Sequence, residues 1–590
     1  MSFKNNPVIY LTKEMWKYSK GNRHNVVLYV SLFVVANLID FLKPLVIGYI
    51  LNIIQEQGLT PESFHSILIG LIFFVVIEII LWLFHGPARI IELKNAFFVR
   101  ANYKKYLLDG TMDLSAEWHT DHHSGDTIDK IEKATSALFE YSIGSFTIIQ
   151  SLIKFISSFV AIIYFNLHSG YIVILTIAIV FPIILKFDKI LVIKYKELFK
   201  TENTISEKIY DALSNITTVI ILRIEKLLSS SIYNKIMSPF KLYQKTNKIN
   251  EVKWFIVSVI VYIMTALILF TYIYGAYKSG TVIMVGTLYA LYGYTERISG
   301  LFFEFAWRYS EIVKQKTRVE NVHEVSDQFV EKVLLRSVLQ NRKWNQLNIK
   351  NLYFSYHKKN LDLNLNDISL TIKRNEKIAF IGHSGSGKTT MLKIIRDLYT
   401  PLKLDLTLDG TKLKYGFKSI SEDISLIPQE PEIFSTTIKE NITLGINKNI
   451  DELKKYTNMA KFTDVVKKLP KQWNSSINEK GVNLSGGEKQ RLALSRGLMF
   501  SEDKSIILLD EPTSSVDFSN ELEIYKNILN KFNNKTIISV VHKLHLLPLF
   551  DTIYLFKNGK IMASGNFNEL LRTSKEFRQI WQKHKDGSFG

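Results

Sequence analysis

The stretch of sequence that decides the fold is Gly382-His383-Ser384-Gly385-Ser386-Gly387-Lys388-Thr389-Thr390. It follows an apolar, strand-like run over 377–381 and precedes a helical pattern, which is the context of a phosphate-binding P-loop. The glycines allow backbone amides to converge on phosphate, and the helix that follows adds its dipole. Lys388 is expected to neutralise the β- and γ-phosphates, and Thr389 to offer its hydroxyl to Mg²⁺. The sequence therefore predicts an α/β nucleotide-binding domain. Its expected nucleotide-binding residues here are Gly382, Ser384, Gly385, Ser386, Gly387, Lys388, Thr389 and Thr390.

A second acidic motif lies 121 residues beyond the P-loop, where the apolar run 505–509 ends in Asp510 and Glu511. Parallel α/β sheets bind their ligands at the carboxyl ends of their strands. We expect Asp510 to hold Mg²⁺ and Glu511 to polarise the attacking water. The alternative to this catalytic role is that the carboxylates form a structural ion pair.

Composition divides the 590 residues into an apolar half, up to about residue 310, and a polar half that carries the P-loop. The chain has no Cys, which excludes a disulfide framework, a Cys zinc site, an iron–sulfur cluster and a Cys nucleophile. With 74 Lys and Arg against 55 Asp and Glu, its net charge is +19. The first 25 residues are polar and show no cleavable signal, so we expect Met1 to be the mature N-terminus.

Six apolar runs in the first half are long enough to suggest membrane helices of about 20 residues. They cover 26–54, 67–84, 143–165, 171–185, 254–277 and 281–306. The fourth is short, and the sixth is the weakest because Glu296, Arg297 and Glu304 fall within it. A set of buried helices in a soluble core is the alternative, but no soluble fold needs six such runs. The expected fold class is therefore an all-α six-helix transmembrane domain followed by the P-loop domain.

Loop charges predict the orientation, because Lys and Arg are retained on the cytoplasmic side. The loops 55–66 and 166–170 contain no Lys or Arg, whereas the connections 86–142 and 186–253 are basic. We expect a multi-pass protein of the cytoplasmic (inner) membrane with both termini in the cytoplasm. The basic cytoplasmic loops, which anionic lipid head groups attract, account for much of the positive net charge, so no nucleic-acid partner is inferred. We expect four parts along the chain: an N-terminal interfacial segment over 1–25, the transmembrane domain over 26–313, a linker over 314–345 and the nucleotide-binding domain over 346–590.

The run Leu484-Ser485-Gly486-Gly487-Glu488-Lys489-Gln490-Arg491 resembles the signature of the ATP-binding cassette (ABC) superfamily. The P-loop and the Asp510-Glu511 segment bracket it, as that family requires. With six spans before them, the whole chain resembles an ABC exporter half-transporter. The resemblance is specific over about 350–575, and over 1–345 it depends mainly on topology.

The resemblance implies roles for residues outside the P-loop. Tyr356 would stack on adenine, although a core strand aromatic is the alternative. Gln429 would contact Mg²⁺ or water and transmit the nucleotide state, and His542 would reach the γ-phosphate. The expected catalytic residues are then Glu511, His542 and Gln429. The expected metal-binding residues are Thr389, Gln429 and Asp510. Ser485, Gly486 and Gly487 would close over nucleotide. Glu488 departs from the family pattern, which usually has Gln there, and its charge puts the nucleotide affinity in question.

In this family the signature closes over ATP held by the P-loop of a second chain, so the resemblance implies a dimer. All expected site residues are present, which favours a homodimer, and a related half-transporter is the other partner to consider. The implied function is ATP-driven export or flipping of an amphipathic substrate, which could be a lipid, a drug-like molecule or a peptide. An ATP-gated channel or a transport-inactive regulator built on the same dimer is the alternative. The inward connections near 113–127 and 212–219 resemble coupling segments of the family.

The remaining sequence features are less specific, and each allows more than one interpretation. His119, His122 and His123 have metal-like spacing, but structural or exposed roles are favoured. Asp40 and Lys43, three residues apart in the first span, are expected to form an ion pair. Glu78 and Lys154 lie within spans without a local partner, so we expect them to pair across helices or to face a polar cavity.

Overall fold

The computed structural model describes residues 6–329, 339, 344–356, 363–477 and 484–585. The chain divides into two compact units, one made of Met1–Leu114 with His122–Val330 and the other of Ser115–Asp121 with Glu331–Gly590. Each unit is described by itself.

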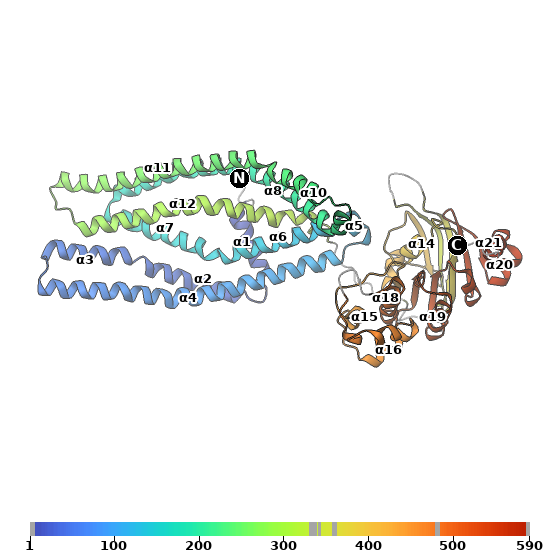
Figure 1. Ribbon diagram of the computed structural model, residues 1–590. Helices are drawn as coiled ribbons and strands as arrows, with labels where there is room; N and C mark the ends of the chain where they lie inside the picture. Colours follow the sequence, from blue (N-terminus) through green and yellow to red (C-terminus); the bar gives the residue numbers. More distant parts are fainter. Residues whose placement is uncertain (1–5, 330–338, 340–343, 357–362, 478–483, 586–590) are drawn as a thin grey trace. The chain divides into compact units, whose positions relative to one another are not determined.

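The first unit is helical (Figure 1). Its helices are α1 (Pro7–Tyr18), α2 (Arg23–Asp40), α3 (Lys43–Gln57), α4 (Pro61–Met112), α6 (Ser124–Ile143), α7 (Ser145–Phe165), α8 (Leu167–Ser214), α9 (Ile216–Ile221), α10 (Glu225–Met237), α11 (Phe240–Ser279), α12 (Val285–Asn321) and α13 (His323–Ser326). Within the described residues, five helical stretches are long and apolar enough to cross a membrane. They are Arg23–Gln57, Pro61–Met112, Ser124–Phe165, Leu167–Ser214 and Glu225–Ser279. The sixth expected span corresponds to α12, which is the most polar of the set because of the charges noted above.

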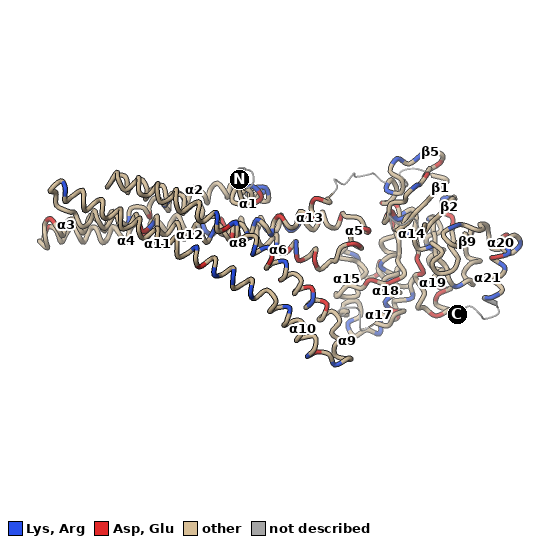
Figure 2. The backbone as a smooth tube through the Cα atoms, turned by 90° about the horizontal axis from the view of Figure 1, so that it is seen from above, with Lys and Arg blue, Asp and Glu red and all other residues tan. Residues whose placement is uncertain are grey.

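The long helices extend well beyond a bilayer. At 1.5 Å per residue the 52 residues of α4 reach about 78 Å, against about 30 Å of hydrocarbon. The part of α4 around Ile72, Ile79 and Leu83 exposes large apolar side chains, as a lipid-facing surface must. Figure 2 shows charged positions thinly spread over α3 and the adjoining half of α4, and frequent along α11 toward its junction with α10. The helices therefore continue out of the apolar zone, as expected from the pattern of the inward connections.

The first expected span, 26–54, is broken between α2 and α3. Pro44 lies in the first turn of α3; it has no N–H, and its ring excludes the carbonyl four residues earlier, that of Asp40. The Asp40 carbonyl accepts instead from Arg297 Nη2 on α12 at 3.0 Å, and the neighbouring Phe41 carbonyl accepts from the Tyr294 hydroxyl on the same helix at 2.8 Å. The break is thus stabilised by a helix distant in sequence.

The second unit contains two sheets. The strands are β1 (Gln346–Phe354), β2 (Leu365–Lys373), β3 (Lys377–Ile381), β4 (Lys403–Leu408), β5 (Thr411–Lys412), β6 (Ile424–Ile427), β7 (Ile506–Asp510), β8 (Thr536–Val540), β9 (Thr552–Lys557) and β10 (Lys560–Gly565). One sheet has the order β2-β1-β4-β5 and is antiparallel. The other has the order β10-β9-β3-β8-β7-β6 and is parallel from β9 to β6.

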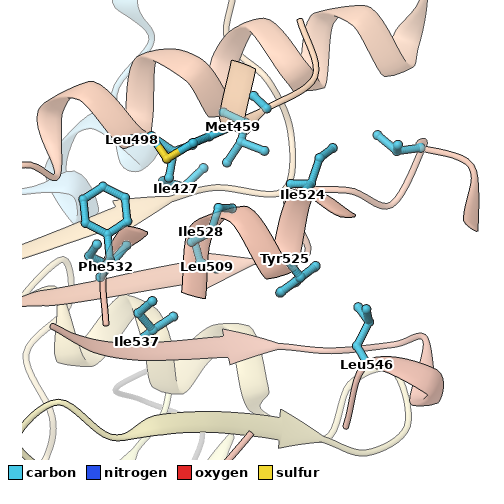
Figure 3. Close-up of a cluster of buried hydrophobic side chains, with 14 of the residues drawn as sticks. Ile427, Met459, Leu498, Leu509, Ile524, Tyr525, Ile528, Phe532, Ile537 and Leu546 are labelled. Carbon is cyan, nitrogen blue, oxygen red and sulfur yellow. The ribbon is translucent and has the colours of Figure 1, made fainter. Parts of the chain in front are cut away.

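Helices complete this unit. They are α5 (Ala116–Asp121), α14 (Lys388–Ile395), α15 (Ile438–Thr443), α16 (Ile450–Met459), α17 (Thr463–Lys468), α18 (Gly486–Phe500), α19 (Phe518–Lys531), α20 (Phe567–Thr573) and α21 (Lys575–Lys585), with the 3₁₀ turns η2 (Gly416–Asp423), η3 (Gln472–Asn474) and η5 (Leu544–Leu549). The larger sheet is buried on both faces, because alternate residues of one strand enter different cores. In β7, Leu509 joins the core of α18 and α19 shown in Figure 3, whereas Leu508 joins the core that faces β1 and β2. This rigid double packing fixes the strand ends where the candidate site lies.

Candidate nucleotide-binding site

Neighbouring strands of the larger sheet carry the expected site residues at their carboxyl ends. The P-loop follows β3, His542 follows β8 by two residues, Asp510 ends β7, and Gln429 follows β6 by two residues. Because β3, β8, β7 and β6 are adjacent and parallel, these residues meet at one edge. A cavity of about 320 Å³ lies there, lined by Asn364, Ser384, Gly385, Ser386, Gly387, Lys388, Thr389, Thr390, Gln429, Glu511 and His542.

The P-loop backbone requires glycine at two positions. Gly382 has φ 146° and Gly387 has φ 104°, in the region that other residues rarely adopt. A Cβ on Gly382 would also collide with the Phe556 carbonyl oxygen, and one on Gly387 would lie 2.6 Å from Leu365 Cδ2. The loop therefore wraps tightly over β9 and β2, with its concave side toward the cavity.

Two polar groups of the loop are poised for a ligand. Lys388 Nζ donates to the carbonyls of Gly382 and His383 at 2.9 and 3.0 Å, which folds the side chain across the loop. Burial lowers the pKa of Lys388, and the carboxylates of Glu511 and Asp510 oppose that shift. Ser386 is buried, and its hydroxyl has no hydrogen-bond partner among the described residues. A phosphate group in the cavity would satisfy both.

Two of the three residues expected to bind metal are hydrogen-bonded to each other. Thr389 Oγ1 donates to Asp510 Oδ1 at 2.9 Å. Burial raises the pKa of Asp510, the bond from Thr389 lowers it, and the neighbouring charge of Glu511 raises it again. A hydroxyl and a carboxylate oxygen at hydrogen-bonding distance are the donor types that Mg²⁺ takes. Thr389 and Asp510 would therefore suit a Mg²⁺ ion bound beside the P-loop.

Glu511 is the meeting point of the three residues expected to be catalytic. Gln429 Nε2 donates to Glu511 Oε2 at 3.1 Å, and His542 Nε2 lies 2.7 Å from Glu511 Oε1. Glu511 has φ 48°, a backbone conformation that is uncommon for a residue with a side chain. The turn after β7 therefore directs its carboxylate between the other two groups.

Tyr356 lies beside this cavity rather than in its lining. Its hydroxyl donates to Thr390 Oγ1 at 3.2 Å, and 38% of the residue is exposed. Its ring makes edge contacts with Phe354 and Tyr399 at centroid distances of 4.9 and 5.1 Å. An exposed ring face beside the P-loop helix is suited to stacking on a base.

The signature residues do not line the cavity. Ser485 is the N-cap of α18, and it forms a capping box with Glu488, whose Oε2 accepts from Ser485 N at 2.8 Å. A Cβ on Gly487 would lie 2.7 Å from the Ser515 carbonyl oxygen, so the helix start lies close against the 514–515 turn. Within the described residues, Ser485, Gly486 and Gly487 thus remain separate from the P-loop of their own chain.

Two residues near the site were given no role by sequence reasoning. Gln490 Nε2 donates to Ser514 Oγ at 2.6 Å and to the Gln429 carbonyl at 3.3 Å, while its Oε1 accepts from Ser515 N at 2.8 Å. It therefore ties α18 to two other segments of the site. Asn364 lines the cavity and accepts from Tyr356 N at 3.0 Å. Gln490 falls within the signature run, whereas no sequence pattern distinguishes Asn364.

The histidine cluster shows no metal geometry. The described residues contain no group of three or more His, Asp or Glu side chains placed to hold a metal ion. His119 and His122 each make an interaction with another group.

The fold and this site are those of an ABC transporter, and comparison with known proteins agrees. Residues 26–294 match the family described as the ABC transporter transmembrane region, and residues 365–514 match the family described as ABC transporter. Together the two matches account for well over half of the chain, which belongs to this family. Its one membrane domain followed by one nucleotide-binding domain is the arrangement of an exporter half-transporter.

Relatives share parts of the sequence. The glutathione/L-cysteine transport system ATP-binding/permease protein CydD of Bacillus subtilis is 34% identical over 40% of this chain and 40% of its own length. The human ATP-binding cassette sub-family B member 5 is 36% identical over 35% of this chain and 17% of its own length. The sub-family B member 6 of Xenopus tropicalis is 26% identical over 80% of this chain and 56% of its own length. The chain therefore spans less than two thirds of each.

A solved structure shares the whole architecture. A bacterial Atm1-family ABC exporter with ATP bound superposes with a TM-score of 0.83, over 95% of this chain and 99% of that one. The sequences are 18% identical, so the likeness concerns the fold.

Proposed function

We propose that this protein uses ATP hydrolysis to export or flip an amphipathic substrate across the cytoplasmic membrane by alternating access. The observation that carries the proposal is the 320 Å³ cavity, where the P-loop, Lys388, Gln429, Glu511 and His542 converge, in a chain that also contains a helical unit with membrane-spanning stretches. A lipid, a drug-like molecule and a peptide all remain substrates that fit this proposal.

The chemistry assigns a task to each residue of the cavity. The loop amides, Ser386 and Lys388 bind the phosphates, and Tyr356 stacks on adenine. Thr389, Asp510 and Gln429 would hold Mg²⁺, which when bound neutralises phosphate charge and orients the oxygens for displacement. Glu511 accepts a hydrogen bond from the attacking water, and His542 contacts the γ-phosphate. Both side chains therefore act where charge develops in the transition state.

The site is incomplete in one chain, which is the argument for a dimer. Ser485, Gly486 and Gly487 lie outside the cavity, so a signature from a second chain is required to cover the nucleotide. A second copy carries every expected residue, and we therefore favour a homodimer over a pair with a related half-transporter. ATP then stabilises the closed pair, and its loss after hydrolysis allows the pair to open.

The two inward connections couple closure of the nucleotide-binding units to reorientation of the membrane helices. The helix α5 clusters with the nucleotide-binding unit of its own chain, whereas α9 belongs to the helical unit. Ile220, Ile221 and Leu222 at the end of α9 are 56%, 72% and 60% exposed, a large apolar surface for a segment outside the membrane. We assign this surface to the nucleotide-binding unit of the second copy. Both termini, and both of these connections, then lie in the cytoplasm.

Reconstitution tests the proposal. Purified protein in proteoliposomes is expected to hydrolyse ATP and to move a fluorescent amphiphile in one direction only, and Glu511→Gln is expected to abolish both. Turnover without movement of any lipid, drug-like or peptide probe would favour the transport-inactive regulator instead. Passive, ATP-opened flux down a gradient would favour the gated channel.

A further inference from the structure

Five charged side chains from α2, α3, α4, α7 and α12 gather in the membrane-spanning part of the helical unit: Asp40, Lys43, Glu78, Lys154 and Arg297. Charged groups at such depth are costly and usually functional. Neither the nucleotide site nor the coupling segments use them.

The carboxylates of this group are fully engaged by protein. Asp40 Oδ1 lies 2.8 Å from Lys43 Nζ, and Asp40 Oδ2 lies 3.2 Å from Arg297 Nη2. Glu78 Oε2 lies 2.6 Å from Lys43 Nζ, and its other oxygen accepts from Trp82 Nε1 at 2.9 Å. The expected ion pair of Asp40 and Lys43 is thus confirmed, and Glu78 does pair across helices.

The cationic groups are not fully engaged. Arg297 Nη1 is buried and has no hydrogen-bond partner among the described residues. Lys154 is half-buried; the charges of Asp40, Arg297 and Glu304 act on it, but it makes neither an ion pair nor a side-chain hydrogen bond within the described part of the chain. The group thus has three cations and two carboxylates that are already engaged. Glu304, which also acts on Lys154, lies 3.8 Å from Arg308, so its charge is offset by that residue. The group therefore carries one excess positive charge and unused donors. Glu296 on the same α12 is exposed.

A cavity lies about one helical turn from Lys154 and Arg297 along α7 and α12. Its volume is about 340 Å³, and its walls come from α1, α7 and α12. Ser151 and Leu301 in its lining lie one helical turn from Lys154 and Arg297, respectively, on the same helix faces. Just over half of the lining residues are apolar, including Ile148, Leu152 and Phe305. The lining also contains Glu304 and Arg308, which lie 3.8 Å apart and offset each other's charge. The cavity therefore suits a hydrocarbon body next to a cationic end.

We propose that Lys154 and Arg297 form a binding site for the anionic group of an amphipathic substrate, whose apolar body occupies the neighbouring cavity. This inference rests on the proposed export function and narrows its substrate class to amphipathic anions. The shared chemistry is a carboxylate, phosphate or sulfate, and its source can be a lipid or a free metabolite. An anion would neutralise the excess charge and accept from the unused donors, which a neutral or cationic amphiphile cannot do.

Equilibrium binding tests the inference without nucleotide. The full chain in phosphatidylcholine nanodiscs is titrated with 11-(dansylamino)undecanoic acid and with its methyl ester, which differ in the carboxylate alone. Protein-free nanodiscs give the lipid background. The acid is expected to bind at least tenfold more tightly than the ester. Competition by dodecyl phosphate and by an anionic lysophospholipid then distinguishes a free anion from a lipid source.

Variants locate the site. Lys154→Gln removes no ion pair or side-chain hydrogen bond of the described residues, so the variant is expected to fold with an unchanged melting temperature. It is expected to reduce the preference for the acid to below threefold. Lys154→Arg is expected to keep the preference, and Lys154→Glu to remove it. The matched control is Lys278→Gln, at an exposed position in the last turn of α11, and this variant should behave as the unaltered protein.

Two results would overturn the inference: equal binding of acid and ester to the unaltered protein, or a Lys154→Gln variant that keeps the full preference. Neither result concerns ATP. Failure of the proposed function would be seen separately, as absence of ATP-dependent movement of any amphiphile in proteoliposomes.

Discussion

His542 Nε2 lies 2.7 Å from Glu511 Oε1, although the two residues come from different strand ends of the parallel sheet. Gln429 holds the other carboxylate oxygen at 3.1 Å. The carboxylate is thus held from both sides at the edge of the cavity that also contains Lys388. In this arrangement Glu511 is oriented before nucleotide enters, which reduces the reorganisation needed for catalysis.

Glu511→Gln should separate nucleotide binding from hydrolysis. The amide keeps the size of the side chain but cannot act as a base, so kcat for ATP is expected to fall about 10²–10⁴-fold. Binding of ATP should change by less than threefold, because the phosphates are held by the P-loop. ATP turnover and equilibrium binding of a fluorescent ATP analogue measure the two quantities. Glu422→Gln, at an exposed position of the same unit, is the matched control.

Gln490→Met should impair turnover while leaving nucleotide binding intact. The variant keeps the length of the side chain but loses the bonds to Ser514, Ser515 and the Gln429 carbonyl. Because these bonds position α18 against the site and not the P-loop, we expect kcat to fall at least tenfold with an unchanged affinity for ATP. A rise in KM at constant kcat would contradict this role.

Glu488→Gln should strengthen the response to ATP. The carboxylate caps Ser485 N, and an amide oxygen can accept the same bond, so the free energy of unfolding should change by less than about 0.5 kcal/mol. The variant removes a negative charge from the face expected to meet a polyphosphate. The ATP concentration for half-maximal turnover is expected to fall several-fold at low salt, and less at high salt. Glu488→Ala, which also loses the cap, should lower the melting temperature instead.

The sequence predicted the nucleotide site better than the membrane unit, and the reason is physical. Ser384–Thr390, Asp510 and Glu511 follow apolar strands directly, so their meeting at one sheet edge follows from parallel topology. The break after Asp40 is stabilised by Tyr294 and Arg297, more than 250 residues away, which donate to the carbonyls of Phe41 and Asp40. The local sequence of 26–54 includes Asp40, Lys43 and Pro44 but contains no sign of those partners.

The same contrast applies to single residues. Gln490 lies inside a run that sequence reasoning singled out, but its contacts reach turns that adjoin it only after α18 packs against the sheet. Lys154 and Glu78 looked alike in the sequence, as lone charges within spans. The structure separates them, because Glu78 finds Lys43 on another helix and Lys154 finds no such partner in the described residues.

Disulfide trapping should reveal the dimer that the nucleotide site requires. The chain has no Cys, so introduced cysteines give no background. Ser384→Cys with Ser485→Cys, in a Glu511→Gln background, is expected to yield a dimer on non-reducing gels when ATP is present during oxidation. Each single cysteine, and Ser230→Cys on α10, should remain monomeric. A cross-link formed within one chain, seen as a monomer with altered mobility, would contradict the shared site.

Gly286→Ala should destabilise the helical unit, whereas Gly300→Ala on the same helix should not. The start of α12 lies directly on α3: Gly286 N donates to Asn52 Oδ1 at 2.8 Å, and a Cβ on Gly286 would collide with the Gly48 carbonyl oxygen. Because that obstacle is backbone, the helices must separate, at a cost of about 1–3 kcal/mol. A Cβ on Gly300 meets nothing within 4 Å, and alanine favours helix by up to about 1 kcal/mol. Thermal unfolding in detergent, followed by size-exclusion chromatography, should therefore move the two melting temperatures in opposite directions from that of the unaltered protein. Equal melting temperatures for the two variants would show that α3 and α12 are not in contact at this point.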